Sequence, residues 1–417
     1  RKLEWKEEVS LADVVKSADS NYITAHFGKG MGGEKMETIG YDITDEDDGN
    51  TTNDNFHGEY VSLKDRSPLP PENPKRMASL KHRSVEFLAK YSGKRPFFMM
   101  VSHYAVHVPH AARPDLIEKY RNLPRGKYCH DDDYLPTDEI PASRKISHWR
   151  LQYAAMIDEV DEGLGAIVET LRKTGQLENT FIIFTSDNGG GLTPNGTLRG
   201  GKANLYEGGL RVPFVVAGPG VLSGVQCDVP ISQWDLLPTL YDYANSDAPL
   251  PDNLDGASLR GVFEAGNKGS VSRSVEGFVF HYPCYFAPPL SVIRIGGYKL
   301  MEHLLTGEQK LYYLVTDYRE QHNLIEEHPE IASELKSVMF QYLQSVDAED
   351  VQDVYKARFA ELNRFEAGAR KVHAQTIERA NGDEELILQA DERLKENLER
   401  FKANRIECRE NMQRTKF

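Results

Sequence analysis

Several features that would place a chain in a functional class at once are scarce here. No apolar run reaches the roughly 18 residues that a bilayer-spanning helix needs, so no membrane span is expected. The four cysteines follow no regular spacing, which leaves the redox compartment open. Basic residues are outnumbered, and the net charge of −14 argues against nucleic acid or an acidic membrane surface as a partner. An anionic ligand would have to be attracted by local positive charge.

The rest of the composition is that of an ordinary globular protein. Hydrophobic residues make up 40% of the chain and charged residues 27%. With 417 residues the chain is long enough for one large domain and a smaller one.

The most informative stretch is residues 181–209, FIIFTSDNGGGLTPNGTLRGGKANLYEGG. An apolar β-rich run ends in Asp187-Asn188, which places an acid and an amide at the C-terminal tip of a strand, where α/β enzymes bind ligands. Both side chains offer hard oxygen donors for a calcium-like or magnesium-like ion. The glycines that follow let backbone approach a ligand closely, and Lys202 adds a cation. The alternative interpretation is a strand followed by a simple turn.

The apolar spacing predicts an alternation of helices and strands. Helices are expected at residues 10–18, 77–91 and 148–174, and strands at 22–25, 96–102 and from 180 onward. Gly175 is expected to cap the third helix. This β-α-β order favours a parallel sheet with helices on both faces.

The remaining segments suggest a different organisation. Residues 45–75 are polar and proline-rich, which predicts an irregular excursion, and 115–147 are expected to form a rim of the cleft. After about residue 250 short β-rich runs flank turns, which predicts a small antiparallel subdomain. We therefore expect a core domain at 1–250, the subdomain at 251–345 and a charged helical extension at 346–417. The extension is interpreted as solvated helices, with self-association as the alternative.

The motifs SDNGG, LRGGK and LYEGGLRVPFVVAGPG resemble the type I sulfatase family of the alkaline-phosphatase superfamily. The resemblance continues upstream in PFFMMVSHYAVHVPH (96–110) and LADVVKSADSNYITAHFGKG (11–30), and downstream in ISQWDLLPTLYDYA, HYPCY and LYYLVTDYREQHNL. It covers roughly residues 8–345. The fold it implies is an α/β, alkaline-phosphatase-like, mostly parallel sheet flanked by helices, with the antiparallel subdomain and helical extension added.

The resemblance implies hydrolysis of a sulfate ester, with carbohydrate sulfates among the candidate substrates, by calcium and a formylglycine nucleophile. Lys29 and Lys202 match the family's sulfate-binding lysines, and His107 matches the histidine that can protonate the leaving alkoxide. Asp187 and Asn188 match two of the metal ligands, and Asp187 also polarises the nucleophile. A metal site built from His103, His107 and His110 is the rival interpretation for that segment.

Other matches carry less weight. His281 in HYPCY is expected to border the substrate pocket, with a buried structural histidine as the alternative. Arg199 and Glu207 are expected to hold loops in place. The family's histidine after G-K-W is replaced, since Met31 stands there and a thioether cannot act as a base. Either His26 or another group would have to substitute, or turnover is impaired.

Two parts of the family's active site do not occur in the sequence: a strand ending in paired aspartates and the C/S-x-P-S/A-R motif that yields formylglycine. None of the four cysteines is followed by x-Pro-x-Arg. We expect a fragment of a longer sulfatase rather than a relative that has lost the chemistry. As given, the chain is expected to bind calcium weakly, to be inactive as an enzyme and to expose apolar edges of its sheet.

Two further functions stay open: a non-catalytic binder of sulfated glycans, and a related phosphodiesterase or phosphonate hydrolase. The expected partner is a sulfated small molecule or sulfated carbohydrate, with no nucleic acid and no membrane span. An oligomer could form through the C-terminal helices. The resemblance implies a periplasmic or secreted protein, although no signal peptide is observable. The sequons at Asn50 and Asn195 are interpreted as chance matches.

Overall fold

The computed structural model describes residues 9–30, 36–44, 73–107, 110–122, 148–191, 195–244, 250–251, 254–283, 288–381 and 383–414. Their contacts divide them into two compact units. The first contains the residues up to Thr185 together with Phe214–Ser274, and the second contains Ser186–Pro213 and the residues from Val275 onward. Each unit is described by itself.

The first unit is built on a parallel sheet with strand order β2-β1-β3. Strand β1 (Ile23–Gly28) lies between β2 (Ile43–Thr44) and β3 (Phe97–Ser102), and all six of its residues are buried. The β1–β3 register runs from Ile23 opposite Phe97 to Gly28 opposite Ser102. A strand hydrogen-bonded on both sides and covered on both faces buries all of its side chains, and here these include the polar Thr24 and His26. The predicted strands and their parallel pairing are confirmed.

A second sheet in the same unit departs from the expectation. Strand β4 (Ile182–Thr185) pairs with β5 (Phe214–Ala217), and the pair is antiparallel. The prediction that β4 continues a parallel sheet is therefore wrong for its pairing with β5. An antiparallel pair needs no crossover helix, and the chain returns to β5 directly from the 186–213 loop. Large apolar side chains stay exposed on these strands: Phe184 is 39% and Val215 is 60% exposed.

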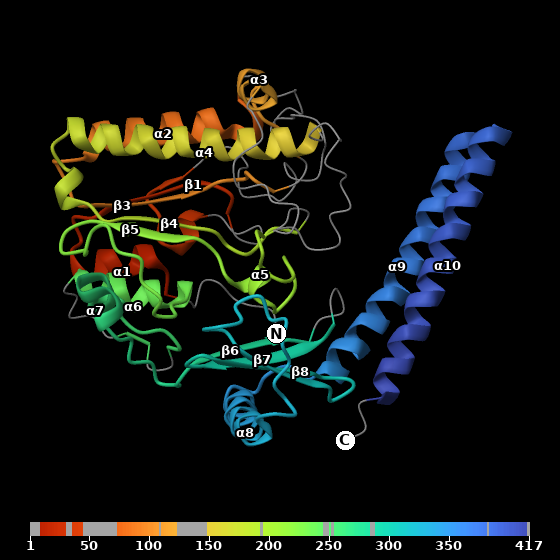
Figure 1. The fold of residues 1–417 in the computed structure, drawn as a ribbon. Helices are drawn as coiled ribbons and strands as arrows, with labels where there is room; N and C mark the ends of the chain where they lie inside the picture. The colour runs from red at the N-terminus through yellow and green to blue at the C-terminus, as the bar shows by residue number, and fades with distance from the viewer. Residues whose placement is uncertain are drawn as a thin grey trace. The chain divides into compact units, whose positions relative to one another are not determined.

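Helices cover both faces of these strands (Figure 1). On one face α2 (Met77–Tyr91) packs against α4 (His148–Lys173), and on the other α1 (Leu11–Ala18) packs against α6 (Leu236–Tyr243). All three predicted helices are confirmed. Gly175 caps α4 with φ +69°, since its N–H donates to the carbonyl of Arg172. The unit's shorter helices are η2 (Met36–Ile39), η4 (Pro74–Arg76), α3 (Pro114–Asn122), η6 (Leu177–Asn179), η7 (Gln233–Asp235), α7 (Arg260–Ala265) and η8 (Gly266–Lys268).

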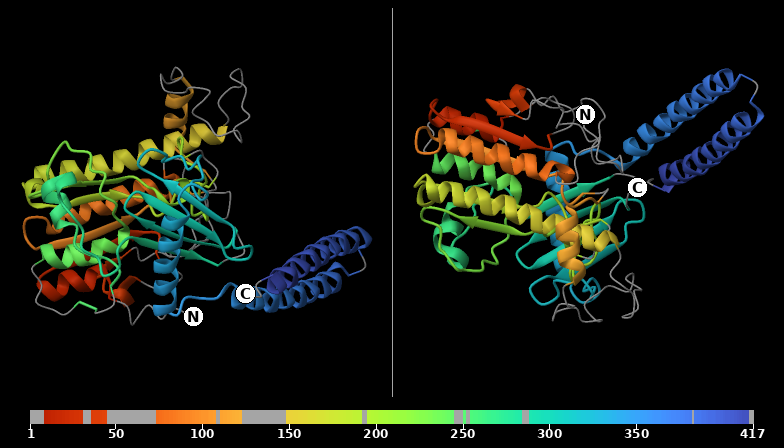
Figure 2. Two further views of the ribbon diagram at one scale, coloured as in Figure 1. Left: turned by 60° about the horizontal axis from the view of Figure 1, so that its bottom comes forward. Right: turned by 90° about the horizontal axis from the view of Figure 1, so that it is seen from above.

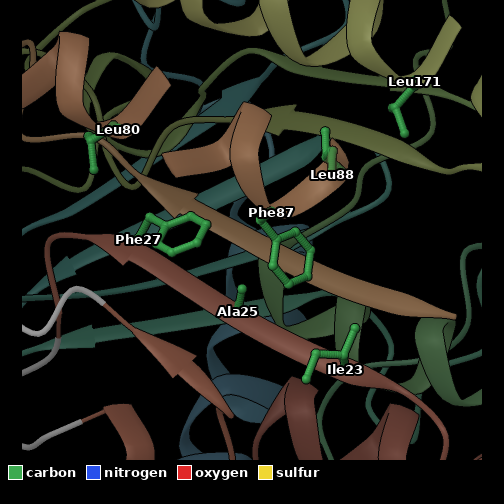
Figure 3. Close-up of a cluster of buried hydrophobic side chains, with 7 residues drawn as sticks. All are labelled: Ile23, Ala25, Phe27, Leu80, Phe87, Leu88 and Leu171. Carbon is green, nitrogen blue, oxygen red and sulfur yellow. The ribbon is translucent and has the colours of Figure 1, made fainter. Parts of the chain in front are cut away.

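An apolar cluster joins β1 to the helices above it (Figure 3). Ala25 and Leu88 are 0% exposed, and Leu171 on α4 is 1% exposed. The full cluster comprises Ile23, Ala25, Phe27, Leu80, Phe87, Leu88 and Leu171. Each large side chain buried there contributes roughly 1.5–3 kcal/mol to folding. The cluster fixes the position of β1, and with it the loop that follows its C-terminal end.

The second unit contains an antiparallel sheet with strand order β6-β7-β8-β9. Its strands are β6 (Phe278–Tyr282), β7 (Leu290–Ile295), β8 (Tyr298–His303) and β9 (Gln309–Tyr313). The β7–β8 hairpin turns at Gly296-Gly297, with Ile295 paired to Tyr298, as the sequence predicted. Helix α8 (Pro329–Ser345) packs on the sheet through Leu335 and Met339.

The chain continues into two long helices, α9 (Val351–Ala380) and α10 (Glu384–Arg414), which pack side by side (Figure 2). This confirms the predicted helical extension. An apolar cluster that includes Tyr355, Leu362 and Phe401 joins the two helices. Farther along, the described residues 363–400 include no fully buried side chain. Among the helices that the structure describes, none is long and apolar enough to cross a membrane.

Some segment predictions lie outside what the structure describes. Of the proposed irregular excursion at 45–75, residues 45–72 are not described, and of the proposed rim at 115–147, residues 123–147 are not described. The described start of that rim is helical, in α3. The expected boundary at 250/251 differs from the division by contacts, which falls at 274/275 and assigns residues 186–213 to the second unit.

Candidate functional site

Two of the predicted site residues follow adjacent parallel strands in the first unit. Lys29 comes directly after β1, and His107 comes five residues after β3 ends at Ser102. The backbone N–H of Lys29 donates to the carbonyl of Ser102 at 2.7 Å. Gly28 makes this approach possible, because its φ is +101° and a Cβ there would lie 2.1 Å from the same carbonyl oxygen. The Lys29 and His107 loops thus leave the same edge of the sheet.

The segment after β3 folds back as a turn, in which the N–H of His107 donates to the carbonyl of Tyr104 at 3.0 Å. Burial lowers the pKa of His103 to about 4. The pKa of His110 is also lowered, first by burial and then by the charges of Lys75 and His107. Across the described residues no group of three or more His, Cys, Asp or Glu side chains could hold a metal ion, so the three-histidine metal site is not found.

His26 was considered as a replacement for the histidine missing at Met31. It lies in β1, is 3% exposed, and its Nε2 is 3.1 Å from the Ser102 hydroxyl. Burial lowers its pKa to about 4, so the ring is neutral at physiological pH. The side chain is part of the strand core, and this position does not favour proton transfer at a ligand. Met31 itself is outside the described residues.

The second unit brings the other predicted site residues together in the loop at 186–213. The N–H of Lys202 donates to the carbonyl of Gly190 at 3.1 Å, which places Lys202 beside the segment that carries Asp187 and Asn188. The N–H of Gly189 donates to the carbonyl of Gly209 at 3.0 Å, so the start and end of the loop are also joined. The sequence pattern predicted this grouping, and the loop's backbone hydrogen bonds produce it.

Glycine is required where these loop segments cross. A Cβ at Gly189 would lie 1.7 Å from the carbonyl oxygen of Gly208, and one at Gly201 would lie 2.2 Å from that of Gly190. Neither contact is possible for a real side chain, so any larger residue would separate the segments. The glycines of SDNGG, RGGK and EGG therefore pack the loop against itself.

Asn195 is a residue whose role the sequence reasoning missed, since its motif was interpreted as a chance sequon. Its Oδ1 accepts from the N–H of Gly190 at 2.7 Å, and its Nδ2 donates to the carbonyls of Gly190 at 3.1 Å and Gly200 at 3.0 Å. One amide side chain thus joins the Asp187 and Lys202 segments. Because Asn-Gly-Thr is also ordinary turn chemistry, no local signal distinguishes this role.

Asp187 and Asn188 are the predicted metal ligands, and the structure shows which contacts their oxygen atoms already make. Asp187 is exposed, and one of its oxygens accepts from the N–H of Asn188 at 2.9 Å. No ion pair to Asp187 occurs among the described residues, so its carboxylate is available to a cation. The donors fit a hard ion such as calcium, and Asp187 and Asn188 would be two of its several oxygen ligands. The set is incomplete in the part of the chain that the structure describes, and weak calcium binding stays a prediction.

His281 lies on β6 in the second unit. Its Nδ1 is 2.7 Å from the Ser291 hydroxyl, and its Nε2 is 2.7 Å from the carbonyl of Glu349. Both ring nitrogens therefore already have partners. This geometry favours the structural alternative, and a substrate contact by His281 stays a prediction.

Arg199 and Glu207 make the loop-holding contacts expected of them. Arg199 donates to the carbonyl of Glu320 at 3.0 Å, and its guanidinium lies over the ring of Tyr206. Glu207 binds Lys299, a buried lysine that the sequence reasoning did not single out.

Comparisons with known proteins identify the family of the chain. The family model "Sulfatase" matches residues 2–246, and a second model, "N-sulphoglucosamine sulphohydrolase, C-terminal", matches residues 201–348. A protein named "Sulfatase" from Formosa agariphila is 31% identical over 256 residues, which is 56% of this chain and 43% of that protein. The chain spans about half or less of the length of the first curated relatives it matches.

Solved structures show the same fold. A structure in complex with D-glucosamine-2-N,6-O-disulfate, described as its substrate, matches with a TM-score of 0.64 and 18% identity, over 83% of this chain and 84% of that one. A structure in complex with k-i-k-neocarrahexaose matches with a TM-score of 0.62 and 22% identity, over 81% and 74%. At these identities the likeness concerns the fold.

Proposed function

Because the chain belongs to the sulfatase family, we propose that it carries part of a site that binds and hydrolyses sulfate esters. The observation that carries this proposal is the loop at 186–213, in which an available carboxylate, an amide and an exposed lysine lie on adjacent segments. The lysine can bind an anion, and the oxygen donors can bind a hard cation. The lysine and the bound cation would together neutralise the charge of a sulfate ester as it reacts.

The proposed roles follow the residue chemistry. Lys202 and Lys29 would neutralise the sulfate oxygens, and His107 would donate a proton to the leaving alkoxide oxygen. Asp187 and Asn188 would ligate calcium, which when bound acts as a Lewis acid on the sulfate. Each lysine side chain provides donors for charge-assisted hydrogen bonds to the anion.

The formylglycine nucleophile has no counterpart in the 417 residues, because the C/S-x-P-S/A-R motif does not occur. We therefore propose that this chain alone binds but does not hydrolyse the ester. A sulfated carbohydrate is the proposed ligand class, supported by the sugars named in the two solved structures. A non-catalytic binder of sulfated glycans is the second candidate, and the absence of the nucleophile motif is the observation that favours it.

Calorimetric titration of the calcium-loaded chain tests the site. D-glucosamine 6-sulfate should bind, and D-glucosamine should not, because the lysines recognise the sulfate. Lys202→Met should weaken binding by about 10- to 100-fold, the cost of losing a hydrogen bond to a charged group. Lys310→Met, which removes a cation from an exposed ion pair with Glu308, is the matched control and should leave binding unchanged.

The same samples distinguish the two candidate functions. Release of inorganic sulfate from D-glucosamine 6-sulfate by the chain alone would contradict the proposal that its nucleophile is absent. Protein purified from its native source should release sulfate if the molecule is a hydrolase, and should bind without release if it is a binder. Equal binding of the sulfated and unsulfated sugars would refute both.

We propose two further properties. The family likeness suggests a periplasmic or secreted protein. Helices α9 and α10 keep apolar side chains exposed, with Phe365 at 48%, Val372 at 61% and Leu388 at 60%, which is the basis for self-association. Sedimentation velocity over a range of concentrations measures this directly.

A further inference from the structure

A cluster of three charged residues is buried in the second unit, next to the 186–213 loop. Lys299 on β8 is 1% exposed, and its Nζ lies 2.9 Å from Glu207 Oε1 and 2.7 Å from Glu320 Oε1. The backbone N–H of Glu207 donates to Glu320 Oε2 at 2.7 Å, which closes the triangle. Glu207 and Glu320 are 4% and 0% exposed. One ammonium group therefore holds two carboxylates away from water.

Two further cations lie near this cluster. Arg199 donates to the backbone carbonyl of Glu320, and Arg294 on β7 has a favourable electrostatic interaction with Glu207. Burial raises the pKa of Glu320, and its contacts with Lys299 oppose that rise. The carboxylates are thus fixed by directional contacts from several sides, in a place where water cannot substitute for a lost partner.

The cluster is connected to the candidate site by a short path of backbone contacts. Glu207 begins the short helix α5 (Glu207–Leu210), and the next two residues, Gly208 and Gly209, bond to Arg199 and Gly189. Gly189 directly follows Asn188. Any displacement of Glu207 would therefore move the backbone that carries the proposed metal ligands.

Buried ion pairs are a poor source of stability, because desolvation of the charges offsets most of their attraction. Their directional geometry, in contrast, can fix one arrangement of the chain. A loop rich in glycine has fewer side chains to pack against its surroundings, and the cluster supplies fixed anchor points at both Arg199 and Glu207.

We propose that Lys299, Glu207 and Glu320 are positioning residues that hold the loop bearing Asp187, Asn188 and Lys202 in its ligand-binding arrangement. This inference rests on the proposed function of that loop. It predicts that substitutions in the cluster reduce the hydrogen-exchange protection of the loop more than that of the antiparallel sheet that carries Lys299.

Two variants and one control test the inference. Lys299→Met leaves two carboxylates without their ammonium partner. Glu320→Gln is milder, because the amide oxygen can still accept from the N–H of Glu207, and it keeps the test open if Lys299→Met does not fold. Lys310→Met removes a partly exposed lysine from β9 of the same sheet and serves as the matched control.

Hydrogen exchange of the full chain is the first measurement. The amides of Gly189, Lys202 and Gly208 should lose about tenfold or more of their protection in both cluster variants, because their hydrogen bonds close the loop. In Glu320→Gln the amides of the β6–β7 ladder should change little, whereas Lys299→Met, which destabilises the whole unit, should reduce ladder protection as well. Equal losses in loop and ladder in Glu320→Gln would show a merely structural role and overturn the proposal, as would unchanged loop protection in both variants.

Terbium luminescence, with Tb³⁺ as the probe for a hard-ion site, is the second measurement. Terbium affinity should fall by about 10- to 100-fold in the cluster variants, as expected when the groups that orient metal ligands are removed. It should stay unchanged in Lys310→Met, and equal losses in all three variants would contradict the proposal. If the unmodified chain binds no terbium, the proposed metal site fails, while the exchange measurement still decides whether the cluster positions the loop.

Discussion

Buried carboxylates in the two units have opposite surroundings. In the second unit Glu207 and Glu320 share the ammonium group of Lys299. In the first unit Glu159 on α4 is 3% exposed, and neither of its oxygens has a hydrogen-bond partner among the residues that the structure describes. Burial raises the pKa of Glu159 to about 7, although Arg113 and Lys81 oppose the rise. A buried acid with a close cation can be used to fix a loop, whereas one without it takes up a proton instead.

The largest effect should come from removing the shared cation. Lys299→Met should lower the free energy of unfolding of the second unit by about 3–5 kcal/mol, because an uncompensated charge is left in the interior. Urea denaturation followed by tyrosine fluorescence measures this change. A loss below about 1 kcal/mol, the range of an exposed pair, would mean that the cluster is not effectively buried.

The buried carboxyl group of Glu159 should make the stability of the chain depend on pH. An unfolded glutamate loses its proton near pH 4.5, whereas Glu159 in the folded chain keeps its proton until about pH 7. Stability should therefore fall by about 3 kcal/mol in total as the pH rises through that window.

Glu159→Gln should remove this part of the pH dependence and stabilise the chain at pH 8. Thermal unfolding at pH 5, 6, 7 and 8 compares the two proteins. Glu178→Gln, at an exposed position in η6, is the control and should not flatten the profile. Parallel profiles for Glu159→Gln and the unmodified chain would contradict a proton held on Glu159.

Removing the neutral side chain of Asn195, which links two segments of the 186–213 loop, should lower stability by less than Lys299→Met does. Asn195→Ala removes three hydrogen bonds and should cost about 1–3 kcal/mol, with terbium affinity falling alongside. Asn267→Ala, at an exposed site that bonds Asp228 and Gln226, is the matched control. If both variants lose the same stability and neither loses affinity, Asn195 has no special part in the loop.

The smallest effect is expected at the surface. Lys310→Met breaks an exposed ion pair with Glu308 and should change stability by less than about 1 kcal/mol. Thermal unfolding at low and high salt measures it. A change as large as that of Lys299→Met would remove the distinction between buried and exposed lysines on which the comparison rests.

Local patterns in the sequence predicted most of the elements. The apolar spacing identified α2 at Met77–Tyr91 and α4 at His148–Lys173, because helix periodicity is encoded within each segment. Strand pairing is not encoded locally, and the antiparallel partner of β4 was therefore missed. The division between the units was missed for the same reason, since contacts and not chain order assign residues 186–213.

The candidate site was predictable where it lies in one continuous motif. The segments that carry Asp187, Asn188 and Lys202 lie together because the loop closes on itself within residues 186–213, and the roles of these side chains stay predictions. Lys299 and Glu320 were not identified, because each lies more than ninety residues from Glu207 and a lysine in an apolar strand resembles an ordinary solvent-facing position. Only the folded chain shows that the three meet.

Lysine acetylation footprinting tests the central claim, that Lys29 and Lys202 recognise the sulfate group, most directly. The calcium-loaded chain is treated with a limiting acetylating reagent while D-glucosamine 6-sulfate is titrated, and modification of Lys29, Lys202 and Lys310 is quantified by mass spectrometry. The account predicts that Lys29 and Lys202 become protected over the same ligand range, while Lys310 is unaffected and D-glucosamine protects none of them. Protection of neither lysine, or equal protection by the unsulfated sugar, would contradict it.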